Sequence, residues 1–162
     1  EGGRVSVDGA LTASGAAGSS IAVLGDTVRV GAAARLDASG TTAGGSVHVG
    51  GAWQGGGDTY RATTTTVEAG ATLADNATSL GAGGEVVVWS DGHTAFAGHV
   101  EARGGAAGGD GGRLEVSGKQ TLAFAGTADA SAPTGAAGSL LLDPTDLTIG
   151  EAEAGVLARV LR

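Results

Sequence analysis

Cysteine is absent from this 162-residue sequence, so the chain contains neither a disulfide framework nor a zinc site built on thiolates. Proline occurs only twice, which excludes collagen and polyproline spacers. No apolar run approaches the roughly 18 residues of a membrane-spanning helix. Any ordered structure must therefore come from packing and backbone hydrogen bonds.

Aromatic and basic side chains are also scarce. The chain has two Trp, two Phe and one Tyr, so a core must be built from Val, Leu, Ile and Ala. Nine basic residues, of which only Lys119 is a lysine, are scattered among 17 acidic ones, and the net charge is −8. Because nucleic acid is bound by a clustered basic face, we expect no nucleic-acid partner.

Glycine is abundant, with 33 residues. Together with Thr, Ser and Val, it favours strands and tight turns over helices. In the stretch GGDGGRLEVSGK, residues 108–119, glycine runs directly into the alternation Leu114-Glu115-Val116. This alternation is typical of a half-buried strand.

Short apolar triplets recur after small-residue turns along the chain. They are Val5-Ser6-Val7, Ile21-Ala22-Val23, Val47-His48-Val49, Val86-Val87-Val88, Leu114-Glu115-Val116 and Leu140-Leu141-Leu142. Three of the five intervals between their first residues span 26, 28 and 26 positions, and the other two span 16 and 39. Further strand-like pieces follow in the same order within the intervals. A repeated period of this kind is the signature of a solenoid.

Three short strands per repeat, joined by glycine corners, predict an all-β fold, a parallel β-helix of about five to six coils over residues 1–150. The 39-residue interval contains GAWQGGGDTYRATT, which predicts a loop insertion at residues 51–64. Apolar residues recur at helical spacing in residues 151–162, which predicts a short capping helix or the start of a next module. Because the chain starts within the pattern, we expect it to be a piece of a longer protein.

The coil assignment predicts which side chains face the interior. The first and third members of the six triplets are expected to point inward as two stacked ladders. The middle members, expected on the opposite face, are Ser6, Ala22, His48, Val87, Glu115 and Leu141. Phe96 and Phe124 occupy the same place in successive second strands, so their rings are expected to stack inside the coil, with Gly98 and Gly126 making room.

Two places in the sequence are candidate sites. The predicted insertion holds Trp53, Tyr60 and Arg61, which predict a ligand-contact loop; the alternative is that the aromatic rings fold back over the apolar edge of the coil. Asn76-Ala77-Thr78 is an N-x-T sequon between two predicted strands, where a corner loop is expected to expose it. Asn76 is therefore a candidate glycosylation site, with a simple turn role as the alternative.

Patterns that would indicate catalysis or metal binding are weak. The outward positions of the third strands form a partly acidic column, Thr12, Asp37, Ala74, Glu101 and Asp129. A solvated acidic stripe explains this column better than a catalytic cleft, because no basic residue repeats beside it. No histidine has a second donor at ligand spacing, and GGDGG does not repeat as calcium-binding nonapeptides do. We therefore expect no catalytic residue, no metal and no cofactor.

The succession VVVWSDGHTAFAGHVEARGGAAGGDGGRLEVSGK, followed by LAFAGTADASA and GSLLLDPTDLTIG, resembles the exoproteins of Gram-negative two-partner secretion, the filamentous-haemagglutinin-like and high-molecular-weight adhesins. The resemblance covers nearly all of residues 1–150 and is specific from Glu85 onward. It implies a right-handed β-helix, export through an outer-membrane secretion partner, and a place at the bacterial surface or outside the cell. The family's secretion domain is not recognisable and no functional residue set transfers, so we expect a shaft segment.

The leading hypothesis for function is a structural and interaction segment of a large secreted or surface-displayed adhesin, a stiff rod without catalysis. Its partners are then the outer-membrane secretion partner and, through the parent protein, a receptor or glycan on a host or bacterial surface. Two alternatives stay open: an exoprotein of the same class that captures haem or a haem carrier, and a β-helical carbohydrate-active enzyme. Glycan binding without turnover favours the adhesin, a ligand-specific loop at residues 51–64 favours haem capture, and cleavage of an acidic polysaccharide favours the enzyme.

Overall fold

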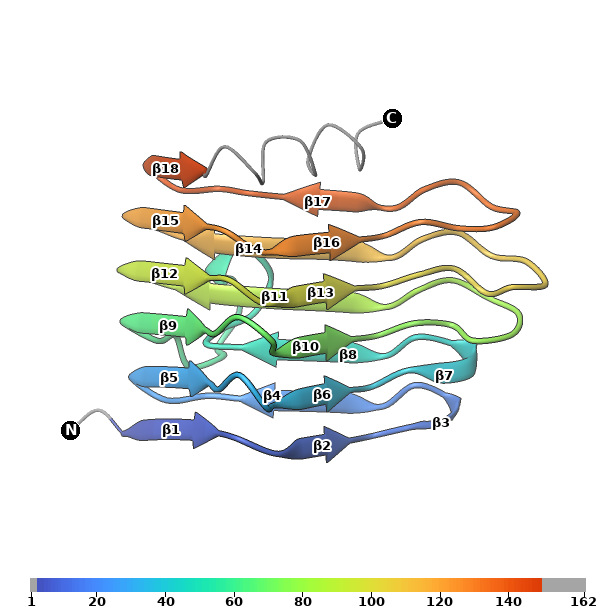
Figure 1. The fold of residues 1–162 in the computed structure, drawn as a ribbon, viewed down its shortest axis with the longest axis horizontal. Helices are drawn as coiled ribbons and strands as arrows, with labels where there is room; N and C mark the ends of the chain where they lie inside the picture. The colour runs from blue at the N-terminus through green and yellow to red at the C-terminus, as the bar shows by residue number, and fades with distance from the viewer. Residues whose placement is uncertain (1–2, 150–162) are drawn as a thin grey trace.

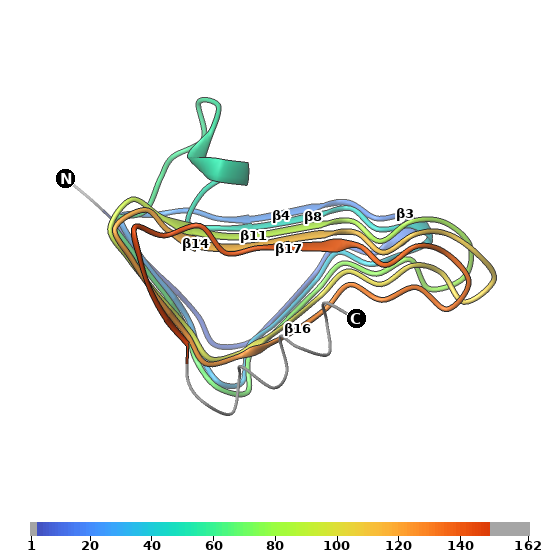
Figure 2. The same cartoon turned by 90° about the horizontal axis from the view of Figure 1, so that it is seen from above.

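The computed structural model of the chain describes residues 3–149, which form a right-handed parallel β-helix (Figures 1 and 2). The predicted fold class is confirmed: the chain passes through three sheets in each coil, and about five coils are stacked on one another. Every pair of named strands is parallel, as expected when each strand pairs with its equivalents in the coils above and below. The helix predicted within residues 151–162 lies outside the described residues.

The three sheets are named here in the order in which a coil visits them from Ser20 onward. The first sheet contains β4 (Ser20–Val23), β8 (Ser46–Val49), β11 (Glu85–Ser90), β14 (Arg113–Gly118) and β17 (Ser139–Leu141). The second sheet contains β1 (Arg4–Val7), β5 (Thr27–Val30), β9 (Thr64–Val67), β12 (His93–Phe96), β15 (Thr121–Phe124) and β18 (Asp146–Ile149). The third sheet contains β2 (Ala10–Thr12), β6 (Arg35–Asp37), β10 (Thr72–Ala74), β13 (His99–Glu101) and β16 (Thr127–Asp129).

Two further strands and one short helix complete the described part. Strands β3 (Gly15–Ala17) and β7 (Gly40–Ala43) pair with each other, and the 3₁₀ helix η1 (Trp53–Gly55) lies between β8 and β9. Seen along the stack, the three sheets enclose a triangular interior, and the chain beyond it forms a thin, flattened extension (Figure 2). We call this extension the flange; residues 103–112 cross it between β13 and β14.

The inward ladders of the first sheet are confirmed. Ile21, Val47, Val86, Leu114 and Leu140 stand in register across five coils. Val86 and Val88 are fully buried in the apolar core, while Leu140 and Leu142 are partly buried against it. Successive coils therefore place apolar side chains directly on top of one another, and the core extends along the whole stack.

The first triplet belongs to a different sheet from the one predicted. Val5 pairs with Val28 of the second sheet rather than with Ile21, and both Val5 and Val7 pack against the core from there. The irregular 16-residue interval between Val5 and Ile21 has this cause, because the two residues are not equivalent in the coil. The triplet alone could not reveal the error, since a strand of either sheet shows the same alternation.

Phe96 and Phe124 stack inside the coil as predicted. Their ring centroids lie 5.4 Å apart with 11° between the planes. A Cβ on Gly126 would lie 2.5 Å from a ring atom of Phe96, so this glycine does make room for a ring. Gly98 instead leaves space beside Val67, the residue that pairs with Phe96 in the coil below.

Outward side chains of the first sheet depart from the prediction at two positions. Ser6 and Ala22 are exposed, and His48 and Leu141 are half-buried. Val87 and Glu115, by contrast, are fully buried although they face away from the interior. The cause is η1, which contacts β11 and β14 from outside (Figure 2). The loop between β8 and β9 therefore buries part of the outer face of this sheet.

Candidate functional site

The segment between β8 and β9 leaves the stack and folds over the first sheet (Figure 2). A buried carboxylate holds it there: the backbone N–H of Gln54 donates to Glu115 Oε2 at 2.7 Å. Gln54 has φ of 52°, in the left-handed region that residues other than glycine rarely adopt. The hydrogen bond to Glu115 thus fixes a strained turn at a defined place on β14.

Two aromatic contacts anchor the loop further. The guanidinium of Arg113 lies 4.6 Å from the ring centroid of Trp53, a cation–π distance. The indole of Trp89 packs beneath the loop so closely that a Cβ on Gly51 would lie 2.7 Å from its ring. Glycine at position 51 is therefore a steric requirement of the Trp89 ring.

Glu115 is fully buried under the loop. Desolvation raises the pKa of its carboxyl, against the hydrogen bond from the backbone N–H of Gln54. Glu115 Oε1 and Ser117 Oγ have no hydrogen bond of normal geometry to any described residue.

Arg61 and Asp91 connect the end of the loop to the end of β11. Arg61 Nε donates to Asp91 Oδ2 at 3.1 Å, and its Nη1 donates to the carbonyl of Gly55 at 3.3 Å. Trp89 Nε1 donates to the other oxygen, Asp91 Oδ1, at 3.1 Å. Desolvation raises the pKa of Asp91, but the hydrogen bonds from Trp89 and Arg61 and the charges of Arg61 and Lys119 outweigh it, so the pKa is lowered.

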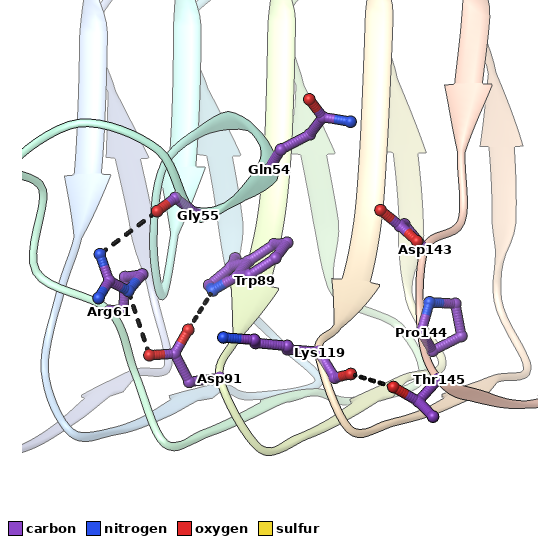
Figure 3. Close-up of a pocket in the computed structure, with 9 residues that line it drawn as sticks. All are labelled: Gln54, Gly55, Arg61, Trp89, Asp91, Lys119, Asp143, Pro144 and Thr145. Carbon is purple, nitrogen blue, oxygen red and sulfur yellow. Dashed lines mark hydrogen bonds and ion pairs between the residues drawn. The ribbon is translucent and has the colours of Figure 1, made fainter.

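A cavity of about 540 Å³ opens between the loop and the next coils (Figure 3). Its lining is Gln54, Gly55, Arg61, Trp89, Asp91, Lys119, Asp143, Pro144 and Thr145. A second cavity, of about 440 Å³, is lined by residues 57–61 and by Asp91. Arg61 and Asp91 line both, so the two cavities adjoin at this ion pair.

The structure separates the three residues of the predicted ligand-contact loop. Arg61 lines both cavities, and Tyr60, which is 52% exposed, lines the smaller one. Trp53 lines neither cavity, and its ring instead stacks on the guanidinium of Arg113. Ligand binding by this loop stays a prediction.

Sequence reasoning missed Trp89, Lys119 and Asp143 as residues of the cavity. Each lies at or just beyond the end of a first-sheet strand, at the corner that leads toward the second sheet. The in-register pairing of Trp89 with Ser117 brings these corners together. The signal was present in the stacked corners SDG, SGK and LDP, which a coil-by-coil alignment places side by side.

The expected exposure of Asn76 is wrong. The residue is only 7% exposed, and both the oxygen and the nitrogen of its side-chain amide form hydrogen bonds. Nδ2 donates to Glu101 Oε1 at 2.8 Å, and Oδ1 accepts from the backbone N–H of Arg103 at 2.7 Å. Asn76 therefore ties one coil to the next, and in the folded chain it is not an accessible sequon.

The acidic column of the third sheet has the predicted register, with Thr12, Asp37, Ala74, Glu101 and Asp129 paired in order. Glu101 lies beside His99 Nε2, at 3.6 Å, and Arg103 Nε, at 3.4 Å. The interaction with His99 lowers the pKa of Glu101 to about 2. The hydrogen bond from Asn76 and the charge of Arg103 act in the same direction, whereas desolvation raises the pKa. Within residues 3–149, no three His, Asp or Glu side chains gather as a metal site would require.

Comparison with known proteins gives a likeness of fold. No family model matches the chain, and no curated protein sequence matches it significantly. The HMW1 secretion domain from Haemophilus influenzae has a similar structure, with a TM-score of 0.63 and 23% sequence identity over 93% of this chain. The chain spans about 40% of that protein's length. At this identity the likeness establishes the shared β-helical fold, which is the fold that the sequence resemblance implied.

The described residues also include no helix long and apolar enough to cross a membrane.

Proposed function

We propose that this chain is a structural and interaction segment of a large secreted or surface-displayed bacterial adhesin, without catalytic activity. The observation that carries this proposal is the unbroken parallel pairing of three sheets, which commits backbone donors and acceptors to the neighbouring coils. Such stacking gives a stiff element without disulfides or metals. The likeness to the HMW1 secretion domain supports the same class of protein through the fold.

The proposal includes export through an outer-membrane secretion partner. The sequence led us to expect a shaft segment, whereas the similar solved structure is a secretion domain. Both parts of such an exoprotein would travel by the same route and fold outside the cell. The acidic surface, with a net charge of −8, keeps neighbouring rods apart once they are displayed.

Export can be tested directly in a bacterial host. The chain is given a signal for transport to the periplasm and is expressed with or without the outer-membrane secretion partner of its own organism. We expect the protein at the surface or in the medium only when the partner is present. Equal retention in the periplasm in both strains would contradict the proposed export.

The absence of catalysis is tested on the purified chain. Incubation with acidic and neutral polysaccharides, with and without calcium, should produce no new reducing ends and no unsaturated products. Formation of either would favour the carbohydrate-active enzyme instead. We propose neither that enzyme nor haem capture.

A further inference from the structure

The two cavities beside the loop share Arg61 and Asp91 in their linings, and we call them together the loop cleft. On the loop side it is lined by residues 54, 55 and 57–61. On the side of the stack it is lined by Trp89, Asp91, Lys119 and residues 143–145. Each cavity is within the range of about 300–1,000 Å³ that small-molecule sites occupy. The ion pair between Arg61 and Asp91 divides the cleft into two compartments.

The larger compartment presents polar groups that are free for a ligand. Among residues 3–149, the side chains of Lys119 and Asp143 form no hydrogen bond and no ion pair. Figure 3 shows both at the cavity, with the exposed amide of Gln54 between the loop and Asp143. A cation, a carboxylate and an amide offer donors and acceptors in one small space, as a ligand with several hydroxyl groups requires.

The same compartment has apolar surfaces beside these polar groups. The ring of Pro144 lines it, and Trp89, which is only 6% exposed, contributes the small part of its indole that the loop leaves uncovered (Figure 3). Tyr60 stands exposed at the smaller compartment. Rings at both ends of a polar cleft match a chain of sugar units, because each unit has an apolar C–H face and an edge of hydroxyl groups.

The charges favour a ligand without net charge. The larger compartment holds two basic and two acidic side chains, and the smaller one adds Asp58. The whole chain carries −8, so a polyanion gains no long-range attraction. Hydroxyl groups, which both donate and accept, suit a site where opposite charges lie side by side.

We propose that the loop cleft binds a neutral oligosaccharide of at least two units, one in each compartment across the Arg61–Asp91 pair. Lys119, Asp143 and Gln54 bond the hydroxyl groups in the larger compartment, and Tyr60 contacts the unit in the smaller one. This inference rests on the proposed function, because it names the class of ligand that the proposed interaction segment would bind. It makes no use of catalysis.

Isothermal titration of the chain with cellohexaose, mannohexaose and chitohexaose tests the site, with oligogalacturonate as the anionic comparator. We expect at least one neutral hexasaccharide to bind with a dissociation constant of about 1 mM or lower. Lys119→Ala and Asp143→Ala should each weaken that binding by about tenfold. Tyr60→Ala should weaken the binding of the hexasaccharide and affect the binding of the corresponding monosaccharide less.

Gln120→Ala is the matched control, because Gln120 is the exposed neighbour of Lys119 and does not line the cleft. It should bind as the unaltered chain does, and circular dichroism checks that all variants keep the fold. Binding of none of the three hexasaccharides at about 10 mM overturns the inference. So does stronger binding of oligogalacturonate, or binding that Lys119→Ala and Asp143→Ala leave unchanged. Export that depends on the secretion partner does not involve the cleft. The export experiment therefore tests the proposed function independently of sugar binding.

Discussion

Phe124 shows how a single side chain in this molecule depends on the coil next to it. Its ring lies on Phe96 of the preceding coil, and the residues in the same register on either side are Val67 and Ile149. The column therefore changes from aliphatic to aromatic side chains and back to aliphatic ones. Gly126, one corner further on, leaves the space that the lower ring needs.

Replacing Phe124 by alanine should lower the free energy of unfolding by about 3–5 kcal/mol, because a buried ring is removed and the neighbouring coils cannot close the cavity. Urea unfolding followed by circular dichroism measures the change. Phe124→Leu, which keeps most of the apolar volume, should cost clearly less. Equal stability of the alanine variant and the unaltered chain would show that the stack contributes nothing.

Asp75 is a second residue whose role depends on its neighbours. It is fully buried where β10 turns toward β11. Its Oδ1 accepts the N–H of Gly45 at 2.5 Å and its Oδ2 accepts the N–H of Glu85 at 2.8 Å. Desolvation raises the pKa of Asp75 from 3.8 to about 7, although both hydrogen bonds favour the ionised form.

A raised pKa in the folded chain means that ionisation of Asp75 disfavours folding. Stability linked to this group is therefore complete below about pH 4 and is lost as the pH rises through about 7, by on the order of a few kcal/mol. Unfolding by urea between these pH values measures the loss. Asp75→Asn should remove this part of the pH dependence, and Asp58→Asn, on the exposed loop, should not. A pH profile unchanged in Asp75→Asn would be the contrary result.

At the scale of elements, glycine columns allow the corners and the flange to stack. Gly45, Gly84, Gly112 and Gly138 immediately precede in-register residues of the first sheet. A Cβ on Gly112 would collide with the carbonyl oxygen of Gly84 in the coil below. The requirement here is close approach of two backbones, since Gly112 does not have a positive φ.

Gly112→Ala should therefore destabilise the chain by about 2 kcal/mol or more, as forced backbone shifts do. Gly9→Ala is the matched control, because a Cβ at Gly9 meets nothing within 4 Å and its φ is not positive. That variant should lie within about 0.5 kcal/mol of the unaltered chain. Thermal or urea unfolding compares the two. Similar stabilities of both variants would disprove the steric role of the column.

At the scale of the whole molecule, stability should vary along the stack. Coils in the middle pair with neighbours on both sides, whereas β1 and β2 lie at one end of their sheets and β16, β17 and β18 at the other. In a solenoid each repeat is stabilised mainly by its nearest neighbours. The central coils also contain the fully buried Val86, Phe96 and Leu114.

Amide hydrogen exchange should reveal this gradient. We expect the slowest exchange in β11, β12 and β14, and exchange faster by about tenfold or more in β1 and β2. Mass spectrometry of peptides from a time course measures it. Uniform protection from β1 to β18 would mean that the described coils open only together.

The sequence by itself determined the architecture. Side chains of a strand alternate between two faces, so each of the triplets at 86, 114 and 140 predicts its own inward residues. The regular spacing of the triplets indicates that the coils follow one another along the chain. The stacked phenylalanines and the acidic column followed from the same period. Each of these features depends only on the position of a residue within its repeat, and that position can be read from the sequence.

Only the tertiary structure decided what covers each outward face. Val87 and Glu115 are buried because the loop folds over them, and Asn76 is buried because its amide bonds the next coil. The loop cleft likewise combines side chains from the loop and from corners of several coils. Burial of an outward-facing residue depends on segments that are far away in the sequence, so no local sequence pattern predicts it.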